Sequence, residues 1–270
     1  QVKNFIQKLR VEEFFALIFF IPIAIAILKE SIEKGFFHSG WGSWVFIITL
    51  LWFFYEVPKN SPTSFSRTFL PVFLCLTIYS NSFKLIQLFE IPDFDHFLLQ
   101  IDQILFKIQP SVWLERVNFP LLTDYLTVTY FLYYFYPLVL GLIFYFKKEW
   151  TVLRKYMLTI VICFYIGYLG YVLFPAIGPR LFVPEQYTQE LKSHKFSQEL
   201  REFLDKLQPT KRDCFPSLHN AVTLLVLVFG FKYHRKFFWG FLPFALGLFL
   251  GTLYLRYHYA IDLLLGWLLG

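Results

Sequence analysis

The chain has 270 residues, of which 57% are hydrophobic, 22% aromatic and only 16% charged. This composition excludes an ordinary soluble domain and is typical of a membrane protein. The formal charge of +6 does not indicate a nucleic-acid partner, because the basic residues lie in short connectors between apolar runs rather than on one face or tail.

Eight apolar stretches come close to the roughly 20 residues that a helix needs to cross a bilayer. The third stretch carries Asn81, Ser82 and Lys84, so we expect it to be tilted, kinked or partly interfacial. The pattern predicts an all-α, polytopic membrane bundle that forms one domain over residues 1–270. The predicted spans are 13–33, 41–57, 68–89, 121–146, 156–174, 216–231, 237–255 and 258 onward.

Two longer polar segments, 91–120 and 181–215, separate some of these spans and are predicted to lie at the membrane surface. In the second segment, four apolar residues recur with the spacing i, i+3, i+4, i+7: Leu200, Phe203, Leu204 and Leu207. That spacing indicates an amphipathic helix on the membrane surface. The alternative is a plain connector.

The charges of the connectors predict the orientation of the chain. Lys and Arg outnumber Asp and Glu in the amino terminus and in the connectors 58–67, 147–155 and 232–236. Short cytoplasmic loops are enriched in Lys and Arg, so these segments, the amino terminus included, are predicted to be cytoplasmic. The starts of the sixth and eighth spans then lie at the extracytoplasmic face.

Polar residues that could carry chemistry gather at that face. Because ionisable groups at membrane depth are costly, such a cluster favours a functional site. The residues come from three span ends: Arg180 from the fifth, Ser217 and His219 from the sixth, and Arg256, His258 and Asp262 from the junction before the eighth.

His258 and Asp262 are four residues apart at a helix start, so the carboxylate can accept the imidazole N–H and leave the other nitrogen free as a nucleophile. Arg180 and Arg256 offer planar, charged forks that suit phosphate oxygens. Pro216 is predicted at the first helical position, where Ser217 and the free amides would form an anion cradle.

His219 has an imidazole whose ordinary pKa of about 6.5 suits proton donation to a leaving alkoxide. Lys211 and Arg212, just before this motif, are further candidates for attracting an anionic head group, or else belong to a solvated charge run.

The stretches "PSLH" (216–219) and "HYAID" (258–262) resemble the second and third signatures of the type 2 phosphatidic acid phosphatase superfamily. The resemblance implies a fold with a core of about six helices over residues 120–270, preceded by about two additional helices and an interfacial segment in residues 1–119. It implies that His258 attacks phosphorus to form a phosphohistidine, that Asp262 orients it, that His219 protonates the leaving group and that Ser217 binds phosphate. No cofactor or metal is implied.

The first signature of that superfamily is absent in its common form. Leu173 stands at the position of its lysine, and Arg180 follows Pro179 instead of preceding a proline. Leu218 replaces the usual glycine of the second signature, and "FPSLH" with "HYxxD" is similar to the branch that includes the inositol phosphorylceramide synthases. The expected substrate is therefore a phosphorylated membrane lipid. Water is the favoured acceptor and a lipid alcohol the alternative, while the oligomeric state stays open.

Two other functions are open from the sequence. His219, His258, Asp262 and His194 offer ligand types that suit a metal site, but Arg180 and Arg256 would repel a cation and attract a phosphate. A non-enzymatic binder or transporter of lipid phosphates would also use arginines, but it has no need of an oriented nucleophile and a proton donor. We therefore expect an enzyme.

Overall fold

The computed structural model describes residues 5–35, 40–59, 63–208 and 210–270, and within them the chain is helical with no β-strand. The predicted all-α class is confirmed. The amino-terminal helices are α2 (Val11–Lys34), α3 (Trp41–Glu56), α4 (Phe65–Ser80) and α5 (Ser82–Phe89). Next come α6 (Asp95–Phe106), α7 (Pro110–Trp113), η2 (Leu114–Val117), α8 (Pro120–Leu132), α9 (Tyr136–Phe146) and α10 (Trp150–Leu173). The last are α11 (Pro179–Phe182), η3 (Pro184–Gln186), α12 (Lys195–Leu207), α13 (Leu218–Tyr233), α14 (Arg235–Tyr254) and α15 (Ala260–Leu269).

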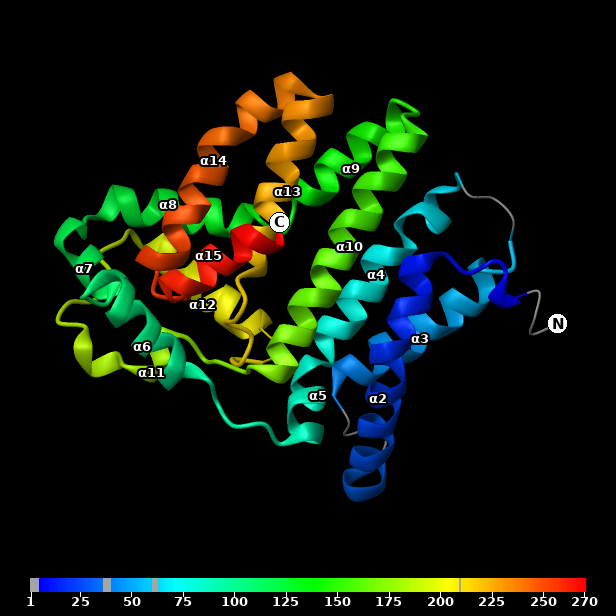
Figure 1. Ribbon diagram of the computed structural model, residues 1–270, viewed down its shortest axis with the longest axis horizontal. Helices are drawn as coiled ribbons and strands as arrows, with labels where there is room; N and C mark the ends of the chain where they lie inside the picture. Colours follow the sequence, from blue (N-terminus) through cyan, green and yellow to red (C-terminus); the bar gives the residue numbers. More distant parts are fainter. Residues whose placement is uncertain (1–4, 36–39, 60–62, 209) are drawn as a thin grey trace.

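Helix α10 lies at the centre of the bundle, with α2, α4 and α5 on one side and α9 and α13 on the other. Helix α14 packs against α13 and α8, and α15 packs against α13 and α6 (Figure 1). The short helices α6, α7, α11 and α12 gather at one end of this arrangement, at the lower left of Figure 1. The polar segments thus cover the end of the bundle where α15 begins.

The apolar helices match the eight predicted spans in order and position. Among the described residues, α2, α10 and α14 are long and apolar enough to cross a membrane alone. Two bent pairs, α4 with α5 and α8 with α9, each pass the same test together, while α3, α13 and α15 are shorter apolar helices. These lengths and compositions are compatible with an integral membrane protein.

The predicted third span is broken, as expected: α4 and α5 meet at 47°. The break lies at Asn81, whose side-chain amide donates to the carbonyls of Gly42 and Thr77 at 2.9 Å. These bonds satisfy backbone groups that a break in the membrane would otherwise leave without partners.

The predicted span 121–146 is bent: α8 and α9 meet at 47° and pass the length and composition test only as a pair. Pro137 lies in the first turn of α9. A proline has no N–H to donate to the preceding turn and its ring clashes with that turn, which favours a break between α8 and α9. The break places Tyr133 beside the start of α13, where its hydroxyl lies 3.4 Å from the carbonyl oxygen of Leu218.

Two close contacts fix the start of α13. A Cβ on Gly266 of α15 would lie 2.5 Å from the carbonyl oxygen of Ser217, and one on Gly170 of α10 would lie 2.3 Å from Pro216. Only a residue without a side chain permits these approaches. The sixth and eighth predicted spans are therefore held against each other at the level of the two motifs.

Candidate active site

Backbone hydrogen bonds join the segments that carry the predicted site residues. The amide of Arg180 donates to the carbonyl of Arg256 at 3.0 Å, and the amide of Ser217 donates to the carbonyl of Asp262 at 3.3 Å. Arg256 has a φ of +66°, a left-handed conformation that reverses the chain just before His258. The three predicted span ends therefore meet, although they are far apart in the sequence.

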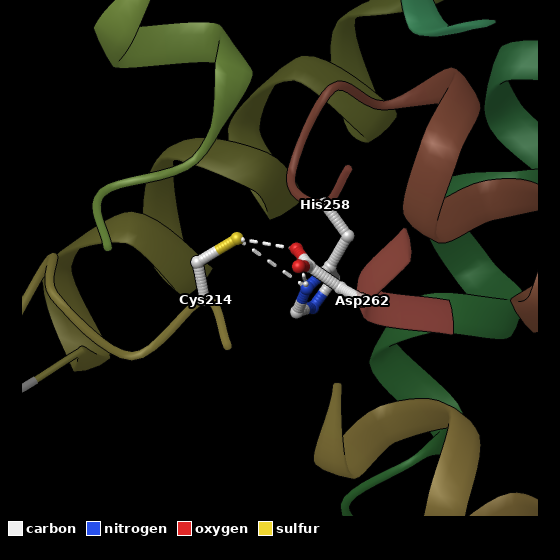
Figure 2. A group of neighbouring side chains, drawn as sticks. All are labelled: Cys214, His258 and Asp262. Atoms are coloured by element: carbon white, nitrogen blue, oxygen red, sulfur yellow. Dashed lines mark hydrogen bonds and ion pairs between the residues drawn. The ribbon is translucent and has the colours of Figure 1, made fainter. Parts of the chain in front are cut away.

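The carboxylate of Asp262 lies behind the ring of His258 (Figure 2). Its Oδ2 is 3.4 Å from Nδ1 of His258 and accepts the backbone N–H of Tyr259 at 2.9 Å. Both side chains are buried, with His258 2% and Asp262 0% exposed. A buried carboxylate at this nitrogen favours the tautomer with the proton on Nδ1, which leaves Nε2 with a free lone pair.

Cys214 also contacts this pair. Its Sγ lies 2.9 Å from Oδ2 of Asp262 and 3.6 Å from Nδ1 of His258 (Figure 2). Burial, together with the charge of Asp262, raises the pKa of the Cys214 thiol well above its usual value, so the thiol stays protonated and donates to the carboxylate. The sequence analysis gave Cys214 no role, because a lone cysteine near polar residues carries no signal of its own.

The free nitrogen of His258 faces the second histidine. Nε2 of His258 is 3.4 Å from Nδ1 of His219. The His219 ring packs against Tyr130 and Tyr133, with centroid distances of 4.6 and 4.4 Å. Its Nε2 is buried and has no hydrogen-bond partner among the described residues. The two imidazoles thus form a pair in which each ring is held by a different set of neighbours.

Both histidines line a small pocket of about 30 Å³, which we call the phosphate pocket. Arg180, Arg256 and Lys211 line it as well. This volume suits a water molecule, so a phosphate group enters only if side chains shift. For phosphorus and an ester oxygen to fit between the two histidine nitrogens, as the resemblance would require, these nitrogens would also have to separate.

Each arginine of the phosphate pocket is paired with a carboxylate. Arg180 holds Asp205 of α12 with two bonds of 2.8 and 3.0 Å. Arg256 binds Glu115 at 2.8 Å and the carbonyl of Gln189 at 2.6 Å. A phosphate that reaches these guanidinium groups therefore competes with acidic side chains of the polar segments.

Other predicted residues lie around this centre. Lys211 lines the phosphate pocket, whereas Arg212 pairs with Asp93 at 2.6 Å and lines a different cavity. The predicted helix start is wrong: α13 begins at Leu218, with Ser217 at the N-cap position, so Pro216 precedes the helix. Ser217 is fully buried and its hydroxyl accepts from Asn220 at 2.8 Å, away from the residues that line the phosphate pocket.

Two carboxylates of α6 hold the loops of the site, and sequence reasoning missed both. Asp102 accepts the backbone N–H groups of Ala260 and Ile261, each at 2.9 Å, at the amino end of α15. Asp95 accepts the amides of Ile177 and Gly178, also at 2.9 Å. Both carboxylates are 0% exposed. Helix α6 therefore fastens the segments on either side of the histidine pair.

Asp102 and the Asp262 side chain together satisfy the first turn of α15. The Asp262 carboxylate accepts the backbone N–H of Tyr259, and the Asp102 carboxylate accepts those of Ala260 and Ile261. The first amides of a helix have no partner within the helix and carry partial positive charge, so carboxylates stabilise this end. The position of α15, and with it the position of Asp262 behind His258, depends on α6.

Among the described residues, one group has ligand atoms close enough to hold a metal ion: Cys214, His258 and Asp262, within 4.8 Å of one another. Neither His219 nor His194 belongs to it; His194 instead pairs with Asp124. The same atoms already form hydrogen bonds, and Arg256 and Arg180 line the adjoining pocket. The closeness of these three side chains can be explained without an ion. The Cys214 thiol donates a hydrogen bond to the Asp262 carboxylate, and that carboxylate orients the His258 imidazole.

Residues 96–270 match the family model of the PAP2 superfamily, the type 2 phosphatidic acid phosphatase superfamily that the two sequence motifs resemble. This match covers more than half of the chain. The chain belongs to the PAP2 superfamily. No curated protein and no solved structure matches. The superfamily supports a phosphatase-type activity, hydrolysis or transfer, on phosphorylated lipids in general terms. The match begins at the second residue of α6, so it includes Asp102, whereas Asp95 lies just before it.

Proposed function

We propose that this PAP2 protein cleaves or transfers the phosphate-bearing group of a membrane lipid through a phosphohistidine on His258. The observation that supports it best is the geometry of the two imidazoles: Nε2 of His258 lies 3.4 Å from Nδ1 of His219, with Asp262 at the other nitrogen of His258. A binding protein needs arginines but not an oriented nucleophile that faces a second imidazole.

In the first step, the lone pair of His258 Nε2 forms a bond to phosphorus, and the bond from phosphorus to the lipid oxygen breaks. The negative charge of the bound phosphate favours the protonated form of His219, which gives its proton to that oxygen, so the lipid leaves as a neutral alcohol. Asp262 stabilises the positive charge that develops on the His258 ring. Arg180 and Arg256 leave their carboxylate partners to balance the phosphate oxygens.

In the second step, His219 accepts a proton from the acceptor, whose oxygen attacks phosphorus while the bond to His258 Nε2 breaks. Water gives hydrolysis, and an alcohol gives transfer. The residues that bind phosphate are the same in both cases, so the acceptor depends on which molecule reaches His219. We place the reaction at the extracytoplasmic surface, because the basic connectors lie at the opposite ends of the spans.

The test is to trap the covalent intermediate. Purified protein is mixed with a lipid phosphate labelled with ³²P and quenched in base, which preserves phosphohistidine. Labelled protein is expected for the wild type and is absent for His258→Ala, while turnover falls by at least about a thousandfold. His194→Ala is the matched control, because that ring is 67% exposed and lies outside the phosphate pocket. Unchanged turnover in His258→Ala, or retained binding without any turnover in the wild type, rejects the proposal.

A further inference from the structure

A second cavity, of about 250 Å³, lies between α4, α10 and the break between α8 and α9. Its wall is almost entirely carbon, with Val72, Leu76, Ile160 and Phe164 among the lining residues. We call it the tail cavity. An apolar cavity of this kind binds hydrocarbon and excludes charged groups.

The tail cavity opens toward the outer surface of the bundle. Three of its lining residues are exposed there: Leu76 by 52%, and Tyr134 and Leu138 by 41% each. In a helical bundle in a membrane, exposed apolar side chains of this kind face lipid. A hydrocarbon chain can therefore enter from the side without crossing the polar segments.

The inner end of the tail cavity is polar and reaches the phosphate pocket. Asp213 and His219 line both cavities, whereas His258 lines the phosphate pocket alone. The hydroxyl of Tyr79 on α4 donates to Oδ2 of Asp213 at 2.9 Å. This pair places one carboxylate at the point where hydrocarbon would meet phosphate.

The stereochemistry of displacement at phosphorus fixes which part of the lipid lies in the tail cavity. The attacking and leaving groups lie on opposite sides of phosphorus. With His258 as nucleophile, the leaving oxygen is beside His219, and the chain attached to it extends into the cavity that His219 lines and His258 does not. An acceptor in the second step must approach from the same side.

We propose, on the basis of the proposed function, that the tail cavity is the lipid-alcohol subsite, and that Asp213 and Tyr79 select alcohols with a second hydrogen-bond donor next to the reacting oxygen. A hydroxyl or amide at that position donates to the carboxylate of Asp213. The subsite binds the departing lipid in the first step, and it can bind a lipid alcohol as the acceptor in the same orientation in the second step. Tyr79 on α4 lies outside the matched region 96–270, whereas Asp213 lies inside it, so the pair joins the amino-terminal helices to the matched region.

The first experiment narrows the opening of the tail cavity with a bulky side chain. Leu76→Trp is compared with Ile166→Trp, which adds the same bulk at a position that is 48% exposed and does not line the cavity. Leu76→Trp is expected to lower kcat/KM for a hexadecyl-chain phosphate by about tenfold or more and to leave a water-soluble aryl phosphate unchanged. Equal losses on both substrates, or in both variants, overturn the assignment.

The second experiment tests selectivity. Wild-type protein is expected to prefer a long-chain phosphate with a hydroxyl beside the ester over the same chain without it. Tyr79→Phe and Asp213→Asn are each expected to reduce this preference by about tenfold, mainly through KM. Tyr79→Phe should change the hydroxyl-free substrate little, whereas Asp213→Asn is judged only by the ratio of the two substrates, because Asp213 also lines the phosphate pocket. A preference that survives both substitutions excludes the role of this pair.

The third experiment separates the subsite from the chemistry. A hexadecyl alcohol that carries a photoreactive diazirine is cross-linked to His258→Ala, a variant without the nucleophile, and to the same variant with Leu76→Trp. Labelling of α4 and α10 in the first and its loss in the second supports the subsite even if the proposed reaction fails. Wild-type turnover without any labelling of these helices rejects the subsite and leaves the proposed function standing.

Discussion

The carboxylate of Asp102 caps the helix that begins at Ala260, and the distance from Oδ2 to the backbone nitrogen is 2.9 Å. These residues are far apart in the sequence, and the bond joins α6 to the helix that carries Asp262. Because Asp102 does not line the phosphate pocket, its effect on catalysis passes through the position of α15. It is a positioning residue.

Asp102→Asn should therefore lower kcat by about tenfold to a hundredfold, because an amide offers one acceptor oxygen where two backbone N–H groups need partners. Loss of this helix cap should also lower the free energy of unfolding by about 0.5–2 kcal/mol. Steady-state kinetics and thermal unfolding in detergent check both. Glu90→Gln, an exposed acid-to-amide change near the start of the same segment, is the control. A rise in KM at constant kcat would indicate a role in substrate binding instead.

Helix α6 also shows why the sequence revealed only part of the site. Its polar residues Asp95 and Asp102 are buried, while Phe97, Ile104 and Leu105 are exposed by 50–68%. This is the reverse of a helix on a soluble protein, in which the apolar face is buried. The available signal was the seven-residue spacing of the two aspartates, which places them on one face, but their backbone partners lie far along the chain.

The convergence of His219, His258 and Asp262 could be predicted. Helices whose ends lie on the same side of the membrane place the residues at those ends at the same depth. Pro137 favours the break before α9 but did not suffice to predict it, because other prolines lie inside continuous helices: Pro22, Pro71 and Pro243. The start of α13 could not be predicted either. Ser217 adopts an extended backbone (φ −70°, ψ 97°) at the N-cap, so the helix begins after the proline that was expected to open it. That geometry depends on the close packing of Gly266 and Gly170 against this turn.

The pairing of Arg180 with Asp205 predicts competition with phosphate. The pair is partly exposed, with side-chain exposures of 28% and 32%, so the ion pair contributes only modest free energy. Asp205→Asn should lower the inhibition constant of inorganic phosphate by about twofold to fivefold, because Arg180 no longer has to leave a carboxylate. Glu199→Gln, on the same helix with an exposed side chain, should not change it. Weaker inhibition in Asp205→Asn would mean that Asp205 orients Arg180 for phosphate.

The half-buried carboxylate of Asp213 predicts that stability depends on pH. Burial raises the pKa of Asp213 from 3.8 to about 6, although the hydrogen bond from Tyr79 acts in the opposite direction. As the pH rises from about 4 to about 6, the unfolded chain releases this proton before the folded chain does, so the free energy of unfolding falls over that interval and the loss is complete above it.

Asp213→Asn removes this pH-dependent loss of stability and keeps an oxygen that can accept the hydrogen bond from the Tyr79 hydroxyl. Its melting temperature should exceed that of the wild type at pH 8 by about 2–4 °C for each kcal/mol recovered, and the difference should shrink as the pH falls below 5. Thermal unfolding from pH 4.5 to 8 measures this, with Glu199→Gln as the exposed control. A difference that stays constant with pH would mean that the carboxylate charge is not the cause.

Cys214 and the arginines predict how the enzyme responds to metal removal. Arg180 and Arg256 would repel a cation in the phosphate pocket, and the Cys214 thiol already donates to Asp262 at 2.9 Å. Activity should therefore persist after exhaustive EDTA treatment. Cys214→Ser, which keeps a donor, should stay within about threefold of the wild type, whereas Cys214→Ala should lose about tenfold in kcat because Asp262 loses a buried hydrogen bond. Complete loss with EDTA that zinc restores, together with equal losses in both Cys214 variants, would instead assign Cys214, His258 and Asp262 to a metal centre.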